Sequence, residues 1–182
     1  FYRCLLWLLL VTCGVSLVPR GSAEAFLPEL ASEAAVLMDA QTGQILFDKN
    51  AYLVMYPASI TKVMTGLLAL EHENPEQELT VSDQVIAQVP RSSSHIALQP
   101  GEKLTLQDAL YALAISSAND AAVAIAEGIS GSVEAFAELM NQEASELGTL
   151  NTHFVNPNGL PSAEHYTTAY DMARITRWAM TV

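Results

Sequence analysis

The stretch YPASITKVMT, residues 56–65, places a serine, Ser59, three residues before a lysine, Lys62. Residues three apart lie on the same face of an α-helix, so a helix here brings the lysine ammonium next to the serine hydroxyl. A serine hydroxyl becomes an effective nucleophile only beside a base. A lysine can be that base only when its pKa falls towards neutrality, which burial causes. The stretch therefore predicts a nucleophile and its base, provided that the helix is buried.

Apolar residues around the pair predict this burial. They cover nearly the whole circumference of a helix that we expect to run to about Glu71: Ile60, Val63, Met64, Leu67, Leu68 and Leu70. Pro57 favours a helix start, and Ser59 then lies in the first turn, where free N–H groups stabilise a developing oxyanion. By itself, however, the four-residue motif is more often a capping serine followed by a lysine that reaches the solvent.

The first 25 residues have the pattern of a secretory signal peptide. Arg3 precedes an apolar run over residues 4–18, and Ala23-Glu24-Ala25 forms an A-x-A cleavage site. We expect cleavage after Ala25, so that residues 26–182 are the mature part of an exported protein.

Three other interpretations of this leader stay open. It could be an uncleaved membrane anchor, although its apolar run is short for a span. Cys13 could carry a lipid anchor, although Thr12 is large for that processing site. Residues 17–22, LVPRGS, also spell a thrombin site of the kind engineered into expression vectors.

The composition excludes several classes of protein. Of the 182 residues 51% are hydrophobic and 15% charged, so the chain is not intrinsically disordered. The net charge of −12 argues against binding to nucleic acid or anionic lipid. Both cysteines lie in the leader, so residues 26–182 have no disulfide or cysteine metal site. The histidines share no ligand spacing and are predicted to be surface or loop residues, so we expect no metal or cofactor: His72, His95, His153 and His165.

Turn-forming residues predict a β-hairpin near the start of the mature part. Residues 34–39 and 44–47 are its strands, and Gly43 between them supplies the positive φ of the turn. Further short strands are predicted for residues 79–81, 96–98 and 153–155.

Four more helices are predicted from capping residues and from the helical spacing of apolar residues. The first is opened by Thr105–Asp108 and broken at residues 115–120, and the second covers residues 121–127 and stops at Gly128. The third starts at Ser130-Gly131-Ser132 and ends at Gly148, and the fourth is opened by Thr168. In the last helix, Met172, Ile175 and Trp178 are expected to face inward. The chain is therefore predicted to be of the α/β (α+β) class.

A second short motif, Ser117-Ala118-Asn119, lies in the predicted helix break. Serine and asparagine favour such non-helical positions. A hydroxyl there can relay a proton, and an amide can hold a substrate carbonyl and contact a buried lysine. Taken alone, the simpler interpretation is the capping of a helix that starts near Asp120.

The two motifs together, S-x-x-K followed by S-x-N, are typical of penicillin-recognising serine enzymes. The segments ASITKVMT (58–65), SSANDAA (116–122) and HFVNPNGL (153–160) resemble the D-alanyl-D-alanine carboxypeptidases of the low-molecular-mass penicillin-binding proteins. The resemblance runs from about Ala34 to Val182. It implies the penicillin-binding protein/β-lactamase-like transpeptidase fold, with the N-terminal hairpin and the helical part present here.

The resemblance also implies a role for each motif residue. Ser59 would be acylated by the terminal D-Ala-D-Ala of a peptidoglycan stem peptide, and its N–H would be half of the oxyanion hole. Lys62 would be the base, Ser117 would pass a proton to the leaving group, and Asn119 would bind the substrate and steady Lys62. β-Lactam antibiotics would trap the same serine. The implied location is the extracytoplasmic bacterial envelope.

The family's third motif, K-T-G, does not occur, because neither Thr-Gly nor Ser-Gly follows Lys49, Lys62 or Lys103. In the family this motif recognises the substrate carboxylate, and its strand supplies the other oxyanion donor. The resemblance therefore implies that residues 26–182 are a truncated N-terminal part of the catalytic domain. We expect this part alone to be inactive, and a C-terminal membrane anchor is left open.

Two alternative functions are kept. A class A-like β-lactamase would need an E-x-x-L-N segment. Glu146–Asn151 comes near this pattern but contains one extra residue. A non-catalytic cell-wall-binding protein could use the same scaffold, although the retained Ser59, Lys62, Ser117 and Asn119 argue against it.

Overall fold

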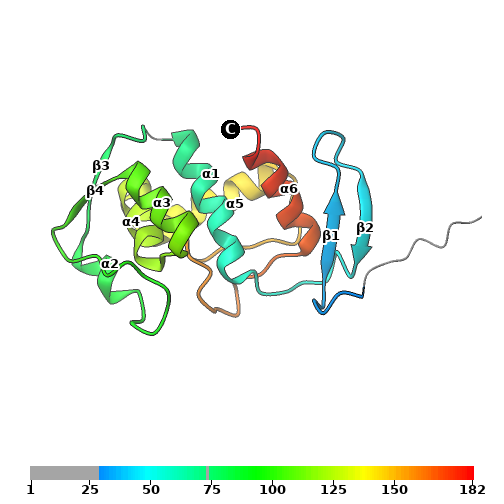
Figure 1. The fold of residues 1–182 in the computed structure, drawn as a ribbon, viewed down its shortest axis with the longest axis horizontal. Helices are drawn as coiled ribbons and strands as arrows, with labels where there is room; N and C mark the ends of the chain where they lie inside the picture. Colours follow the sequence, from blue (N-terminus) through cyan, green and yellow to red (C-terminus); the bar gives the residue numbers. More distant parts are fainter. Residues whose placement is uncertain (1–28, 73) are drawn as a thin grey trace, which may run out of the picture. The chain divides into compact units, whose positions relative to one another are not determined.

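The computed structural model describes residues 29–72 and 74–182. The chain divides into two units, residues 1–31 and 32–182. The second unit holds the elements drawn in Figure 1, in chain order β1 (Ala35–Met38), β2 (Ile45–Lys49), the 3-10 turn η1 (Ala58–Thr61), α1 (Lys62–His72), β3 (Glu78–Thr80), α2 (Asp83–Ala87), β4 (Lys103–Thr105), α3 (Leu106–Ser116), α4 (Asn119–Ser130), α5 (Val133–Glu146) and α6 (Ala169–Ala179). This mixture confirms the predicted α/β (α+β) class. The predicted signal peptide, residues 1–25, lies outside the described residues.

The predicted hairpin is confirmed by β1 and β2, which pair antiparallel. Gly43 in the turn has a φ of 75°, a left-handed value that favours glycine. The Asp39 carboxylate accepts hydrogen bonds from the backbone N–H and the hydroxyl of Thr42, both at 2.7 Å. These local bonds fix the turn.

A second antiparallel pair joins β3 to β4, and this pairing was not predicted. The expected strand at residues 96–98 is wrong. The backbone N–H groups of Ile96 and Leu98 donate to the buried carboxylate of Asp120 instead of to a neighbouring strand. Helix α2, capped by the Ser82 hydroxyl, was also missed.

Three predicted helix starts are confirmed by their side-chain caps. The hydroxyls of Thr105, Ser132 and Thr168 each accept a hydrogen bond from the backbone N–H three residues later. Each bond satisfies one of the N–H groups that a first turn leaves unpaired.

The predicted end of α4 at Gly128 is wrong, because the helix continues to Ser130. Gly128 serves packing instead: a Cβ at this position would overlap the side chain of Leu79 in β3. The helix ends at Gly131, whose φ of 78° is typical of a glycine C-cap.

Two further expectations about the C-terminal third are wrong in part. Residues 153–155 form no strand but only an isolated bridge between His153 and Tyr166. Met172 and Ile175 are buried as predicted, whereas Trp178 is 46% exposed. Its indole N–H donates to Glu71 at the end of α1, a polar contact that keeps the ring at the surface.

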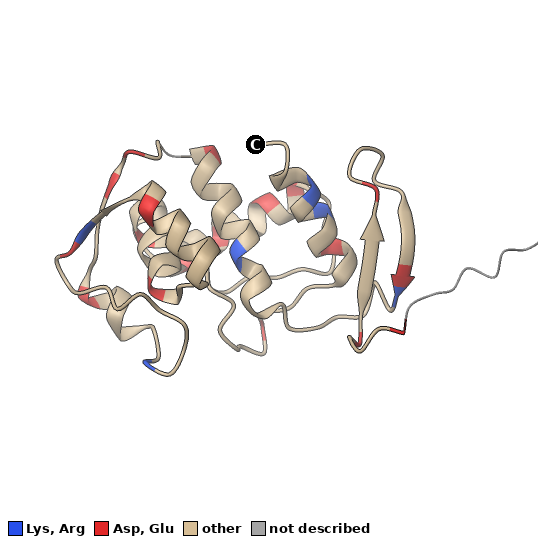
Figure 2. Cartoon of the chain, in the orientation of Figure 1, with Lys and Arg blue, Asp and Glu red and all other residues tan. Residues whose placement is uncertain are grey.

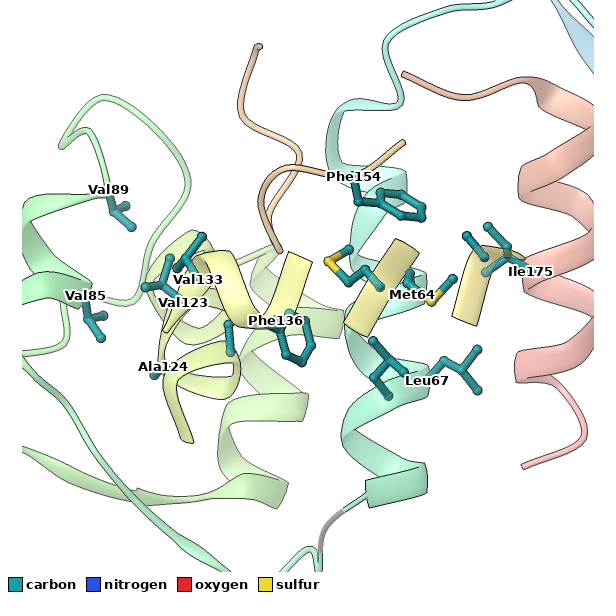
Figure 3. Packing of buried hydrophobic residues seen from close by; sticks show 14 of the residues in the cluster. Met64, Leu67, Val85, Val89, Val123, Ala124, Val133, Phe136, Phe154 and Ile175 are labelled. Carbon is teal, nitrogen blue, oxygen red and sulfur yellow. The ribbon is translucent and has the colours of Figure 1, made fainter. Parts of the chain in front are cut away.

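The core forms where helices from distant parts of the sequence meet. Figure 3 shows Met64 and Leu67 of α1 packed with Phe136 of α5, Phe154 of the following loop and Ile175 of α6. Helix α4 is the most enclosed element, since residues 119–126 are all buried. Such burial on all sides of α4 and most sides of α1 fixes the ends of both helices, where the motif residues lie.

The helices pack in a continuous series. α6 packs against β1 and α1, α1 packs against α3, α4 and α5, and α4 packs against α5 and β3. Figure 2 shows Asp and Glu far outnumbering Lys and Arg along this framework. Within the described residues, none of the helices has the length and apolarity that crossing a membrane requires.

Candidate active site

Ser59 lies in the 3-10 turn η1, directly before α1, rather than in the first turn of α1 as predicted. Ala58, the residue before it, has a φ of 49°, in the left-handed region that residues with a Cβ avoid. The Ser59 side chain is exposed and accepts a hydrogen bond from the Lys62 side chain, with 3.3 Å between Nζ and Oγ. The predicted contact between hydroxyl and ammonium is therefore present.

Lys62 is buried, which contradicts the alternative of a lysine that reaches the solvent. Its side chain is only 7% exposed. Besides Ser59, the ammonium donates to the side-chain oxygen of Asn119 and to the carbonyl of Asn158, both at 2.7 Å. Burial lowers the pKa of Lys62 from 10.5 to about 8. About one lysine in ten is then neutral at pH 7 and able to accept a proton.

The Ser117-Ala118-Asn119 motif lies in the predicted break between α3 and α4. Ser117 is in the left-handed conformation, with φ 51° and ψ 36°. Ala118 is the N-cap of α4, and no side chain caps this helix start. The capping interpretation of the motif is therefore wrong. Asn119 is 5% exposed and its side chain reaches Lys62.

A loop that sequence reasoning had not connected to Lys62 completes the arrangement. Residues 155–165 run beside η1 and α1: Asn158 accepts from Lys62, and the carbonyl of Pro157 accepts from the Thr65 hydroxyl at 2.6 Å. The NPNG sequence indicated a turn, but nothing local in it identified the helix on which the turn packs. The Asn158 carbonyl has no net charge, so it holds the lysine while favouring the charged form much less than a carboxylate would.

These groups suit acyl transfer. A hydroxyl touches an amine of lowered pKa, and Ser117 lines the same groove as Ser59 and Lys62. A family model described as D-alanyl-D-alanine carboxypeptidase, peptidase S11, matches residues 21–181. The chain belongs to the D-alanyl-D-alanine carboxypeptidase family.

Individual members of this family are similar over most of the chain. D-alanyl-D-alanine carboxypeptidase DacF of Bacillus subtilis is 47% identical over 150 residues, which are 80% of this chain and 38% of that protein. D-alanyl-D-alanine carboxypeptidase DacD of Escherichia coli is 36% identical over 158 residues, 82% of this chain and 41% of that protein. The chain thus spans about two fifths of the length of these relatives.

Solved structures show the same fold. The crystal structure of the D-alanyl-D-alanine carboxypeptidase DacD from Francisella tularensis superposes with a TM-score of 0.77 at 37% identity, covering 84% of this chain and 38% of that one. Penicillin-binding protein 6B from Escherichia coli superposes with a TM-score of 0.76 at 33% identity, covering 86% of this chain and 53% of that one. The fold is therefore that of the penicillin-binding DD-peptidases, as the resemblance implied.

A buried carboxylate beside the S-x-N motif of this family member was not foreseen. Asp120 is 2% exposed and accepts hydrogen bonds of 3.0 to 3.1 Å from the backbone N–H groups of Ile96, Leu98 and Ala121. The N–H of Asn119 donates to the carbonyl of Ser94. Asp120 thus fixes the loop over residues 94–98 against the start of α4, next to the asparagine that holds Lys62.

His165 is a loop residue, as predicted, but it is buried, with only 1% of its surface exposed. Its Nε2 atom lies 2.8 Å from the Oγ1 atom of Thr61. Burial, and to a lesser extent nearby His153, lower the pKa of His165 from 6.5 to about 4. Among the described residues, no cluster of histidine and acidic side chains could hold a metal ion.

A groove of about 660 Å³ opens beside the serine. Ser59, Lys62 and Ser117 lie along it, and its remaining walls are mostly apolar, from Val63, Leu67, Leu70, Leu110 and Leu113 among others. Glu146, the glutamate of the segment that comes near the E-x-x-L-N pattern, does not line this groove; it lines a different cavity and accepts a hydrogen bond from Gln142. The geometry therefore gives the β-lactamase alternative no support.

Proposed function

We propose that the protein containing this chain is a serine-type D-Ala-D-Ala carboxypeptidase of the bacterial cell envelope. It removes the terminal D-alanine from peptidoglycan stem peptides through an acyl-enzyme on Ser59. The observation that carries the proposal is the 3.3 Å contact between the Ser59 hydroxyl and a buried Lys62 whose pKa is about 8. The names of the relatives supply the substrate class.

In the acylation step, Ser59 Oγ attacks the carbonyl carbon of the D-Ala-D-Ala peptide bond. The hydroxyl proton passes to neutral Lys62 Nζ as the new C–O bond forms. The Ser59 backbone N–H stabilises the oxyanion. The C–N bond then breaks, and the departing D-alanine amine receives a proton through the Ser117 hydroxyl.

Asn119 has two tasks in this scheme. Its side-chain oxygen accepts from Lys62, so the amide N–H groups are oriented away from the lysine and serve as donors to a substrate carbonyl. Water afterwards hydrolyses the ester and frees Ser59. A β-lactam reacts by the same attack, because its strained amide takes the place of the peptide bond.

The proposed location is extracytoplasmic, in keeping with the signal-like pattern of residues 1–25. A peptidoglycan substrate is available only on that side of the cytoplasmic membrane. The acidic composition, with 20 Asp and Glu against 8 Lys and Arg, fits a protein that does not bind nucleic acid.

The test is acylation of the whole gene product that contains this chain by a fluorescent penicillin, together with D-alanine release from a peptide ending in D-Ala-D-Ala. Ser59→Ala and Lys62→Met should abolish both signals, and Ser117→Ala should lower them. Ser116→Ala is the matched control, because Ser116 is an exposed neighbour at the end of α3 and should retain full activity. A folded wild-type protein without labelling would leave the non-catalytic alternative.

A further inference from the structure

The turn that presents Ser59 is held in a strained conformation. Ala58 has a φ of 49°, which costs a residue with a Cβ free energy relative to ordinary backbone. Such strain persists only where surrounding contacts fix the backbone. The contacts that fix η1 therefore decide where the Ser59 hydroxyl lies relative to Lys62.

The loop over residues 155–165 supplies these contacts. Gly159 lies so close to the turn that a Cβ on it would overlap the carbonyl oxygen of Ala58. The same loop accepts hydrogen bonds from Lys62 and Thr65 through its backbone carbonyls. Among the described residues, His165 is the one side chain of this loop that forms a hydrogen bond with η1, and its partner there is Thr61.

The hydrogen bonds of His165 identify its tautomer. The backbone N–H of Val155 donates to Nδ1 at 3.0 Å, so Nδ1 carries no proton. The proton of the neutral ring is then on Nε2, which donates to Thr61 Oγ1 at 2.8 Å. The ring also packs edge-on against Phe154, with centroids 5.6 Å apart. His165 thus bridges the loop, through Nδ1, and the nucleophile turn, through Nε2.

Thr61 stands between Ser59 and Lys62 in the sequence and is completely buried. A shift of the Thr61 side chain also moves Ser59 and Lys62, because all three residues lie where η1 continues into α1. Proton transfer from hydroxyl to amine depends steeply on their separation and alignment.

We propose that His165 is a positioning residue for acylation: its Nε2–H bond to Thr61 holds the strained turn so that Ser59 Oγ stays aligned with Lys62 Nζ. This role rests on the proposed function, since it concerns the rate at which Ser59 is acylated. His165 itself touches neither substrate nor the reacting atoms.

Two substitutions separate the two bonds of the ring. In His165→Gln the amide N–H lies near the position of Nε2 and can still donate to Thr61, while the acceptor for Val155 is lost. In His165→Asn the side-chain oxygen lies near the position of Nδ1 and can accept from Val155, while the donor to Thr61 is lost. Thr61→Val removes the partner hydroxyl with little change of shape.

The experiment measures, in the whole gene product, the acylation rate constant at saturating penicillin and the dissociation constant of the noncovalent complex. Circular dichroism identifies a temperature at which each variant is folded. His165→Asn and Thr61→Val should acylate about 10- to 100-fold more slowly with an unchanged dissociation constant, and His165→Gln should stay within about threefold of wild type. The double variant His165→Asn/Thr61→Val should be no slower than the slower single variant.

The control is His153→Asn in the same region, because the His153 ring bonds to the carbonyl of Glu164 and not to η1, and this variant should keep the wild-type rate. If His165 only stabilises the fold, His165→Asn should be acylated as fast as His165→Gln or faster. That result would overturn the proposal. So would folded variants that all acylate at the wild-type rate, or multiplying losses in the double variant. A wild-type protein that is never acylated would overturn the proposed function and this role together.

Discussion

The ammonium nitrogen of Lys62 lies 2.7 Å from the side-chain oxygen of Asn119, a residue 57 positions later in the chain. This bond joins the lysine at the start of α1 to the S-x-N motif at the start of α4. The amide has no charge, so it orients the amine without the increase in pKa that a carboxylate partner would cause. Burial therefore remains the main determinant of the Lys62 pKa.

The pH dependence of acylation should follow Lys62. Only the neutral amine accepts the serine proton, and its pKa of about 8 makes its fraction fall about tenfold for each pH unit below that value. The acylation rate constant should rise with pH from 6 and level off above about 8. Rates with a fluorescent penicillin between pH 6 and 9.5 measure this profile. A flat profile across that range would exclude Lys62 as the base.

The same lowered pKa has a consequence for stability. Between about pH 8 and 10.5 the unfolded chain holds a proton on Lys62 that the folded chain releases. The free energy of unfolding contributed by this residue should therefore rise with pH across that window. Urea denaturation of the wild type and of Lys62→Met, compared at pH 7.5 and 10, checks the sign.

Asn119→Asp should move the acylation profile to higher pH. A carboxylate in place of the amide stabilises the charged ammonium and raises the pKa of Lys62 above its present value. The midpoint should shift upward by about one unit or more, so that acylation at pH 7 falls by about tenfold or more. Asn74→Asp is the control, because it adds the same charge in an exposed turn and should leave the midpoint unchanged.

Gly159→Ala should destabilise the protein more than its backbone angle explains. Gly159 and Gly101 have nearly equal φ values, 81° and 80°, but only Gly159 has a neighbouring backbone atom in the place of a Cβ. Gly101→Ala should cost about 1–2 kcal/mol of unfolding free energy, and Gly159→Ala about 3 kcal/mol or more with slower acylation. If urea denaturation gave equal losses of unfolding free energy for the two variants, the close contact between Gly159 and the Ala58 carbonyl would be contradicted.

Asp120→Ala should release the loop over residues 94–98. Removing the carboxylate leaves buried N–H groups unpaired, and we expect a loss of about 2–4 kcal/mol of unfolding free energy. Amide exchange at Ile96 and Leu98 should accelerate. Glu138→Ala, an exposed acidic position on α5, should change stability by less than about 0.5 kcal/mol. Unchanged exchange at the two amides would contradict the role assigned to Asp120.

Local features of this fold could be predicted from the sequence. The contact between Ser59 and Lys62 spans three residues, and the caps at Thr105 and Thr168 are formed within one turn. The hairpin turn around Gly43 is equally local. In each case, the few residues that form the contact are also the residues whose types predicted it.

The long-range contacts of the site left no comparable signal. The Asn158 carbonyl is 96 residues from Lys62, and His165 is 104 residues from Thr61. A backbone carbonyl can belong to any residue type, and a histidine in a polar loop is usually exposed, so neither partner could be identified. The false strand at residues 96–98 has the same origin, because its N–H groups bond to Asp120, 22 to 24 residues later.

Under the proposed function, the distance in sequence between Lys62 and Asn158, one of the residues that enclose it, also determines when Ser59 becomes reactive. During synthesis the lysine emerges well before its loop partner, and in an unfolded chain its pKa keeps the ordinary value near 10.5. On that proposal, a polypeptide that is not yet folded, or one that has misfolded, carries an inert serine. Under the proposed function, penicillin labelling counts native molecules, and the fraction labelled in a growing culture is a direct measure of how much of the protein has matured.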